Sequence, residues 1–117
     1  LIEIERGDFD HWAIYVGRGY VIHVTGLGKA GVACVSSGFG QVVVKKKLLE
    51  KVVRKNKWCV NNKYDNYWKP FPVKEIIQRA EGWVGEKVPY CCFWNNCEHF
   101  VTKLRYGVGL SDQVSVT

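Results

Sequence analysis

Three short segments at the start of the chain constrain the fold most, because tight turns separate them. Leu1–Glu5 alternates apolar and acidic residues, whereas His11–Val16 and Tyr20–Val24 are rich in β-branched and aromatic residues. Between the last two, Gly17–Gly19 leaves room only for a hairpin connection. Strands this close in sequence usually pair with one another, so the sequence predicts an antiparallel meander.

The predicted hairpin brings two histidines to the same end of the sheet. His11 begins the second segment, and His23 lies near the end of the third. Antiparallel pairing places such residues on adjacent strands within side-chain reach, although the sequence leaves the register open. A single histidine in a strand is usually structural. Two at matching positions of one hairpin favour a functional site.

Residues 95–107 have the pattern of an amphipathic helix with a cysteine in its first turn. Asn95 or Asn96 is suited to cap the helix, and Gly107 to end it. The residues on the apolar face are Cys97, Phe100, Val101 and Leu104. A thiol at this position ionises more readily, because the helix dipole and the free N–H groups favour the thiolate. A lone cysteine on an apolar face is nevertheless more often a buried structural residue.

The middle of the chain supplies the remaining predicted elements. Thr25–Gln41 is a glycine-rich loop beside the active-site end of the sheet, and Trp58–Val60 is a short strand. Val73–Val84 is a helix that starts after a proline and ends at a glycine. Between the loop and the short strand, the helical spacing predicts an amphipathic helix whose apolar face is formed by Val44, Leu48, Leu49, Val52 and Val53.

This predicted helix carries the whole excess of positive charge. The chain has a formal net charge of +6. Between positions 45 and 57 there is one acid, Glu50, and the bases are Lys45, Lys46, Lys47, Lys51, Arg54, Lys55 and Lys57. Two interpretations stand side by side: a cationic surface for an anionic membrane leaflet or nucleic acid, and an ordinary solvated helix face.

Composition limits the domain organisation. The 117 residues suit one domain, 1–117, with one core, and we expect it to be a catalytic or binding domain cut from a longer protein with a terminal anchor. No segment is apolar enough to cross a bilayer, and no secretory signal is present. The five cysteines are odd in number and irregularly spaced, which indicates free thiols in a reducing compartment.

The cysteine helix suggests two kinds of chemistry, a metal site and a nucleophilic site. Cys92, Cys97 and His99 lack the paired short spacings of zinc sites, so we expect neither a metal nor another cofactor. His99 follows Cys97 by two residues on the predicted helix, so the two side chains diverge. A nucleophilic cysteine with a distant histidine as base fits better, since a second imidazole can orient the first.

Five segments then identify a family resemblance. They are DHWAIYVG (10–17), YVIH (20–23), VNNKYD (60–65), NCEHFVT (96–102) and RYG (105–107). Together they closely resemble the lecithin:retinol acyltransferase-like proteins, and most closely the HRAS-like suppressor branch, the phospholipase A and acyltransferase enzymes. The resemblance extends over nearly the whole chain, and the NCEHFV block is its most specific part.

The resemblance implies both a fold and a set of catalytic residues. The fold is α+β and permuted papain-like, of the NlpC peptidase type, with an antiparallel sheet packed against helices. The activity is that of a phospholipase A1/A2 and acyltransferase, which forms an acyl-thioester and N-acylates phosphatidylethanolamine. In that pattern Cys97 is the nucleophile, His11 the general base and acid, and His23 the residue that orients His11.

We further expect glycerophospholipid substrates, an anionic membrane surface contacted through the lysine-rich segment, no nucleic acid, and a monomer. The full-length protein is expected to be cytoplasmic and membrane-associated. Two alternatives remain open. One is a non-catalytic module that binds lipid or protein, with a structural thiol, and the other is an acyltransferase whose acceptor is retinol.

Overall fold

The computed structural model of the protein describes residues 1–7, 10–26, 39–91 and 97–110. The fold is α+β, as predicted. Along the chain the elements are β1 (Ile2–Glu5), β2 (Asp10–Gly17), β3 (Tyr20–Gly26), β4 (Phe39–Leu48), α1 (Leu49–Val53), β5 (Trp58–Val60), the 3₁₀ helix η2 (Lys63–Asn66), α2 (Val73–Trp83), β6 (Lys87–Cys91) and α3 (Cys97–Tyr106).

Within the described residues, six strands form one antiparallel sheet in the order β5-β1-β2-β3-β4-β6. The predicted meander of the first three strands is confirmed. β2 is shared between two neighbours, because Asp10–Ala13 pairs with β1 whereas the part from Ile14 onward pairs with β3. The turn that follows is tight, and Arg18 adopts a positive φ of 57° between two glycines.

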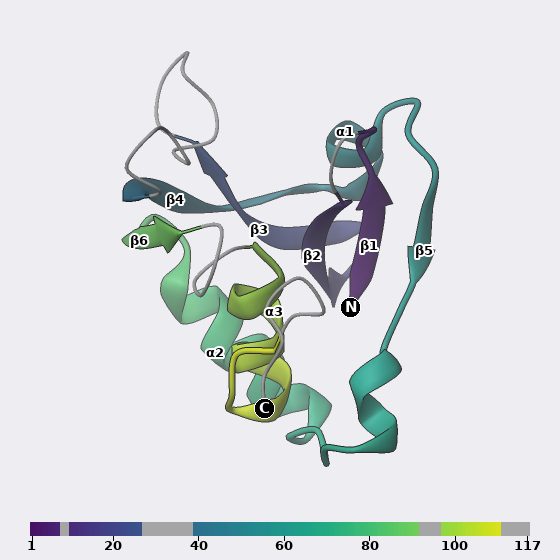
Figure 1. Ribbon diagram of the computed structural model, residues 1–117, viewed down its shortest axis with the longest axis vertical. Helices are drawn as coiled ribbons and strands as arrows, with labels where there is room; N and C mark the ends of the chain where they lie inside the picture. The colour runs from purple at the N-terminus through teal and green to yellow at the C-terminus, as the bar shows by residue number, and fades with distance from the viewer. Residues whose placement is uncertain (8–9, 27–38, 92–96, 111–117) are drawn as a thin grey trace.

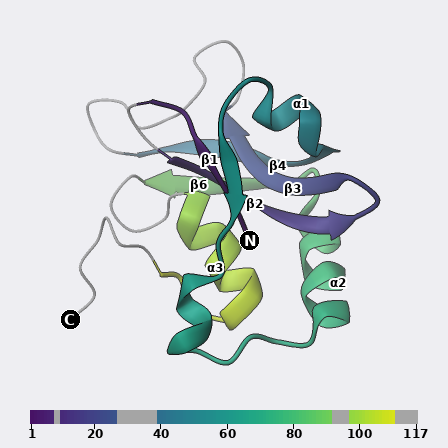
Figure 2. The same ribbon diagram turned by 90° about the vertical axis from the view of Figure 1, so that its right-hand side faces the viewer.

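Helices cover both faces of the sheet: α2 and α3 lie on one side and α1 on the other (Figures 1 and 2). The larger core cluster joins strand residues to α2 and α3, and includes Trp12, Ile14, Ile22, Val42, Val44, Ile76, Ala80, Val101 and Leu104. The smaller cluster lies against α1 and consists of Ile2, Ile4, Ala13, Val21, Val52 and Val53, with Leu49 packed against it. The sheet is therefore apolar on both faces. One face packs against α2 and α3, and the other packs against α1.

The predicted amphipathic helix over the lysine-rich segment is wrong in its first half. Residues 44–48 belong to β4, which pairs with β3 from Val24↔Val44 to Tyr20↔Leu48, and the helix α1 begins only at Leu49. Val44 and Leu48 are four residues apart, a spacing that fits one face of a helix and equally one face of a strand. The β-branched residues Val42, Val43 and Val44, together with the edge of β3 that is available for pairing, favour the strand.

This correction divides the three consecutive lysines between the two faces of the sheet. Val44 and Lys46 share the face of α2, and the Lys46 Nζ lies 2.7 Å from Glu81 Oε1 of that helix. Lys47 pairs with Val21, which belongs to the cluster on the α1 side. Lys45 and Lys47 therefore project from the face that is covered by α1, the helix that carries Lys51.

The other predicted elements agree more closely with the structure. Trp58–Val60 is a strand, and α2 ends at Trp83, just before Gly85 with φ +90°. The expected glycine-rich loop is shorter than Thr25–Gln41, because β3 extends to Gly26 and β4 begins at Phe39. Residues 27–38 and the two candidate caps Asn95 and Asn96 lie outside the described residues.

α3 is anchored at its carboxyl end by polar contacts. Arg105 binds both carboxylate oxygens of Asp65 in η2 at 3.1 and 2.8 Å, and the Tyr106 hydroxyl donates to the same carboxylate at 2.6 Å. The buried Thr102 hydroxyl accepts the Leu110 N–H at 2.8 Å. In the part of the chain that the structure describes, no helix is both long and apolar enough to span a membrane.

Candidate active site

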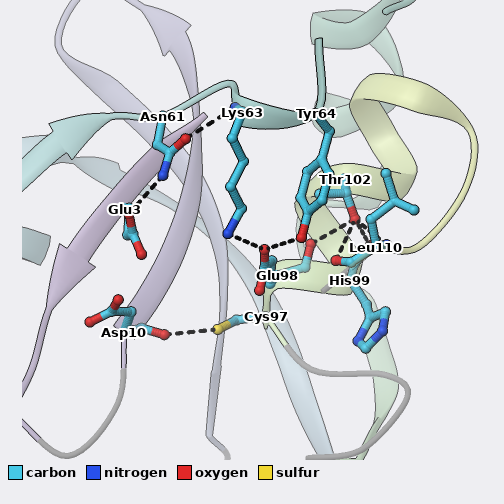
Figure 3. A network of polar contacts seen from close by, with 10 residues as sticks. All are labelled: Glu3, Asp10, Asn61, Lys63, Tyr64, Cys97, Glu98, His99, Thr102 and Leu110. Carbon is cyan, nitrogen blue, oxygen red and sulfur yellow. Dashed lines mark hydrogen bonds and ion pairs between the residues drawn. The ribbon is translucent and has the colours of Figure 1, made fainter. Parts of the chain in front are cut away.

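Cys97 is the first residue of α3, and its sulfur lies against the start of β2. The helix packs on β2 and β3, so its amino end is directed at the sheet (Figure 1). The Cys97 Sγ lies 3.8 Å from the main-chain oxygen of Asp10, the residue directly before His11 (Figure 3). The side chain is buried, with 6% exposed. The predicted cysteine at the helix start, turned inward, is confirmed.

The two histidines of the first hairpin meet. His11 Nε2 lies 2.8 Å from His23 Nδ1, and the rings pack edge to face with an interplanar angle of 80°. His11 is the second residue of β2, and His23 is buried in β3. The sequence predicted this neighbourhood, although it could not fix the register that produces it.

The register also shows from which side each group reaches the site. His11 pairs with Ile4, which belongs to the core cluster on the α1 side, and cross-strand partners project from the same face. Cys97 belongs to the cluster on the α3 side. The cysteine and the histidine pair therefore converge on the beginning of β2 from opposite faces of the sheet.

The environment keeps both imidazoles neutral. Burial lowers the pKa of His11 to about 3, with the neighbouring His23 and then Arg6 acting in the same direction. Burial also lowers the pKa of His23 to about 4, and the charges of Lys47, Arg6 and Lys45 add to this shift. At neutral pH one ring must therefore donate and the other accept across the 2.8 Å contact.

Arg6 is a charged neighbour of the site that the sequence interpretation did not include. Its Nη2 donates to the main-chain oxygen of Val52 in α1 at 2.7 Å. Burial lowers the pKa of its guanidinium, and so does the nearby charge of Arg54, whereas Cys97 acts in the opposite direction. Arg6 thus lies within electrostatic reach of Cys97 and of both histidines. The sequence signal that Arg6 lies near the site was its position in the turn that directly precedes β2.

His99 is buried rather than exposed, and its ring points away from the Cys97 sulfur (Figure 3). It lies against Gly109, where an added Cβ would come within 3.2 Å of the ring. Burial lowers the pKa of this imidazole as well. The divergence of His99 from Cys97 agrees with the helix geometry. Cys92, the remaining member of the rejected zinc set, lies outside the described residues.

A second polar group beside the nucleophile was also missed. Glu98 has only 5% of its surface exposed, and its Oε2 accepts from the Tyr64 hydroxyl at 2.9 Å. The Lys63 Nζ lies 3.5 Å from the same oxygen. No role at the site was predicted for Glu98. Its spacing of three and four residues from the buried Val101 and Thr102 was the signal that it faces inward.

Comparison with known proteins identifies the family of the chain. The model of the family "Lecithin retinol acyltransferase" matches residues 1–110. Phospholipase A and acyltransferase 3 of Mus musculus is 52% identical over 118 residues, which cover 97% of this chain and 73% of the relative. Phospholipase A and acyltransferase 2 of Homo sapiens is 48% identical, over 98% of this chain and 74% of the relative.

A third relative, phospholipase A and acyltransferase 1 of Homo sapiens, is 44% identical over 98% of this chain and 70% of its own length. The resemblance found in the sequence is thereby confirmed. The observed order also agrees with it, since the strands that carry the histidines precede the helix that carries the cysteine. The chain belongs to the lecithin retinol acyltransferase family.

Proposed function

We propose that this protein is a thiol-dependent phospholipase A1/A2 and phospholipid acyltransferase. In this proposal Cys97 is the nucleophile, His11 the general base and acid, and His23 orients His11. The observation that carries the proposal is the position of Cys97. Its sulfur, at the amino end of α3, lies on the Asp10 carbonyl, one residue from a histidine that is paired with a second histidine. The names of the relatives support the same reaction class.

The first half of the reaction transfers an acyl group to sulfur. His11 takes the thiol proton, and the Cys97 thiolate attacks the carbonyl carbon of a glycerophospholipid ester. The tetrahedral intermediate collapses with cleavage of the bond between this carbon and the glycerol oxygen. His11 returns the proton to that oxygen, so a lysophospholipid leaves and an acyl-thioester remains on Cys97.

The second half releases the acyl group. Water or the amine of phosphatidylethanolamine attacks the thioester carbonyl and gives its proton to His11. The carbon–sulfur bond breaks, and the proton passes from His11 to the sulfur. The products are a fatty acid or an N-acylated lipid, together with the free thiol.

The histidine pair fits these proton transfers. To accept from Cys97, the unprotonated nitrogen of His11 must be Nδ1, so its Nε2–H donates to His23 Nδ1 across the 2.8 Å contact. His23 then keeps its proton on Nε2, an atom that is buried and has no hydrogen-bond partner among the described residues. The contact thus selects the tautomer of His11 and fixes the plane of its ring, which is the role proposed for His23.

The charge distribution supports an anionic membrane surface as partner. Lys45 pairs with His23 in the sheet, and cross-strand partners project from one face, so Lys45 and Lys47 lie on the face of the histidine pair. The further bases on this side, in α1 and directly after it, are Lys51, Arg54 and Lys55. A leaflet held there would present its ester groups near the start of β2. This is the basis for proposing a cytoplasmic, membrane-associated enzyme.

Intact-protein mass spectrometry after exposure to phosphatidylcholine vesicles tests the proposal. The wild-type protein is expected to gain the mass of one acyl group minus one hydrogen, and hydroxylamine should remove it, because a thioester is cleaved under those conditions. The Cys97→Ala variant should gain nothing, while Cys59→Ala, which removes an exposed thiol, should behave as the wild type. Absence of acylation on the wild type, or equal acylation of Cys97→Ala, would refute the proposal.

A further inference from the structure

The carboxylate of Glu98 directly follows the candidate nucleophile and is buried. A carboxylate removed from water is costly unless charge and hydrogen bonds compensate it. An uncompensated negative charge next to Cys97 would also oppose the thiolate, because like charges raise the pKa of an acid. The negative charge of Glu98 would therefore oppose ionisation of the Cys97 thiol, which the helix amino end otherwise favours.

Lys63 supplies the compensation. Its Nζ lies 3.5 Å from Glu98 Oε2 (Figure 3), and the Tyr64 hydroxyl donates to the same oxygen at 2.9 Å. The ammonium group also lies 5.2 Å from the ring centres of both Trp12 and Tyr64, so two aromatic faces confine it. The cation is thus held beside the carboxylate, although 31% of the Lys63 side chain is exposed.

Lys63 is itself tied to β1, the strand that pairs with the beginning of β2 and with His11. Its main-chain N–H donates to Asn61 Oδ1 at 3.0 Å, and Asn61 Nδ2 donates to Glu3 Oε1 of β1 at 2.9 Å. The pKa of Glu3 is raised, first by burial and then by a hydrogen bond with the Asp10 side chain. Polar contacts therefore run from Glu98 through Lys63 and Asn61 to Glu3, and a separate contact joins Cys97 to Asp10 (Figure 3).

We propose that Lys63 and Glu98 are positioning residues of the acyl-transfer site: the Lys63 ammonium neutralises the carboxylate next to Cys97, and the pair locks the start of α3 to the start of β2. This inference rests on the function proposed above for Cys97. Neither side chain touches the substrate. Lys63 acts on the thiol through Glu98, and Glu98 acts through its charge and its anchor to η2.

The test measures alkylation of Cys97 by iodoacetamide between pH 5 and 10, followed by mass spectrometry on the peptide that contains Cys97. Among the described residues, the charged and titratable groups on the elements around the sulfur come from the β1–β2 connection, from β2, from η2 and from α3 itself, and are Arg6, Asp10, His11, Lys63 and Glu98. Lys63→Met leaves the carboxylate uncompensated. Its thiol pKa should rise, and each unit of rise slows alkylation at neutral pH about tenfold.

Opposite charge changes separate this role from a merely structural one. Glu98→Gln removes the negative charge but keeps an acceptor for Tyr64, so its alkylation at neutral pH should be as fast as in the wild type or faster. The double variant Lys63→Met/Glu98→Gln should recover most of the rate lost in Lys63→Met, and Lys63→Arg should retain the wild-type profile. Lys74→Met, which removes an exposed lysine of α2, is the matched control and should change nothing.

Unchanged alkylation of folded Lys63→Met would overturn the inference. Slow alkylation of Glu98→Gln would do the same, and this variant keeps the test decisive should Lys63→Met fail to fold. In acyl-transfer assays, Lys63→Met should lower kcat and leave KM for the phospholipid unchanged. Alkylation needs no lipid, so failure of this inference is distinguishable from failure of the proposed function, which would appear as wild-type protein that forms no acyl-thioester.

Discussion

His11 Nε2 and His23 Nδ1 lie 2.8 Å apart, and this contact joins two adjacent strands at the end of the sheet where Cys97 also arrives. The two rings share one hydrogen bond, so the protonation of each depends on the other. His11 directly follows Asp10, the residue that Cys97 contacts, whereas His23 lies on the neighbouring strand and contacts His11. Their replacement should therefore have unequal effects.

Removing the imidazole of His11 should nearly abolish turnover. A positioned general base contributes about 10²–10⁴-fold, so kcat of His11→Ala for phosphatidylcholine hydrolysis should fall by that factor. His23→Gln should reduce kcat less, because His11 remains and loses only its orienting partner. Steady-state kinetics on mixed micelles measure both. A near-normal rate for His11→Ala would remove this residue from the mechanism.

The neutral histidine pair should make the fold sensitive to mild acid. The folded pKa values of His11 and His23, about 3 and 4, lie below the ordinary value of 6.5. Between these limits the unfolded chain binds more protons than the folded protein, so stability is present above pH 6.5 and declines as the pH falls toward 4. Glu3 acts in the opposite direction, because its folded pKa is raised.

Thermal unfolding followed by circular dichroism from pH 7.5 to 4.5 checks this prediction. The melting temperature should fall over that range, and the fall should be smaller in His11→Gln/His23→Gln, which has no imidazole to protonate in the pair. Equal slopes in the wild type and in the double variant would show that the acid sensitivity has another origin.

The split of the consecutive lysines predicts an asymmetric effect on membrane binding. Lys45→Gln/Lys47→Gln removes two charges from the face of the histidine pair, and at about 1 kcal/mol per base, affinity for anionic vesicles should fall about 25-fold. Lys46→Gln/Lys74→Gln has the same net charge, but Lys46 lies on the α2 side beside Glu81. Vesicle sedimentation should show a much smaller loss for this control. Equal losses would mean that net charge alone governs binding.

Gly107 should tolerate a side chain less well than Gly85, although both have a positive φ, of +85° and +90°. A Cβ at Gly107 would lie 3.0 Å from the Phe71 ring, whereas at Gly85 nothing lies within 4 Å. Both alanine variants carry the backbone cost, and only Gly107→Ala adds the contact. Urea unfolding should show that Gly107→Ala loses about 1–3 kcal/mol more than Gly85→Ala.

The Thr102 hydroxyl should matter for stability because it accepts the Leu110 N–H at 2.8 Å in a fully buried position. Carbonyl oxygens of Glu98, His99 and Leu110 lie within 2.9–3.2 Å, ready to accept its single proton. Thr102→Val keeps the shape but leaves a buried N–H without its acceptor, a cost of about 1–3 kcal/mol in the free energy of unfolding. Thr102→Ser keeps the hydroxyl and should lose less.

Local patterns were sufficient for the elements in which one periodicity dominated. The hairpin of β2 and β3 and the helix at Cys97 follow from turn residues and apolar spacing, and they bring the proposed catalytic groups to one end of the sheet. Local patterns failed between Val44 and Leu48, because the spacing there suits a helix and a strand alike. Only pairing with β3 decides that this segment is a strand. The spacing of Glu98 on its helix indicated that it faces inward, but its pairing with Lys63 was missed because an ion pair between distant segments leaves no periodic trace.

The contact between Cys97 and Asp10 spans 87 positions of the chain. During synthesis, a nascent chain that has not yet reached α3 carries both histidines and most of the sheet but lacks the proposed nucleophile. If the proposed mechanism holds, lipid chemistry can therefore begin only after translation has passed α3. A product of premature termination upstream of α3 would then be inert toward the membranes of the cell that makes it, instead of acting on them as an unregulated fragment.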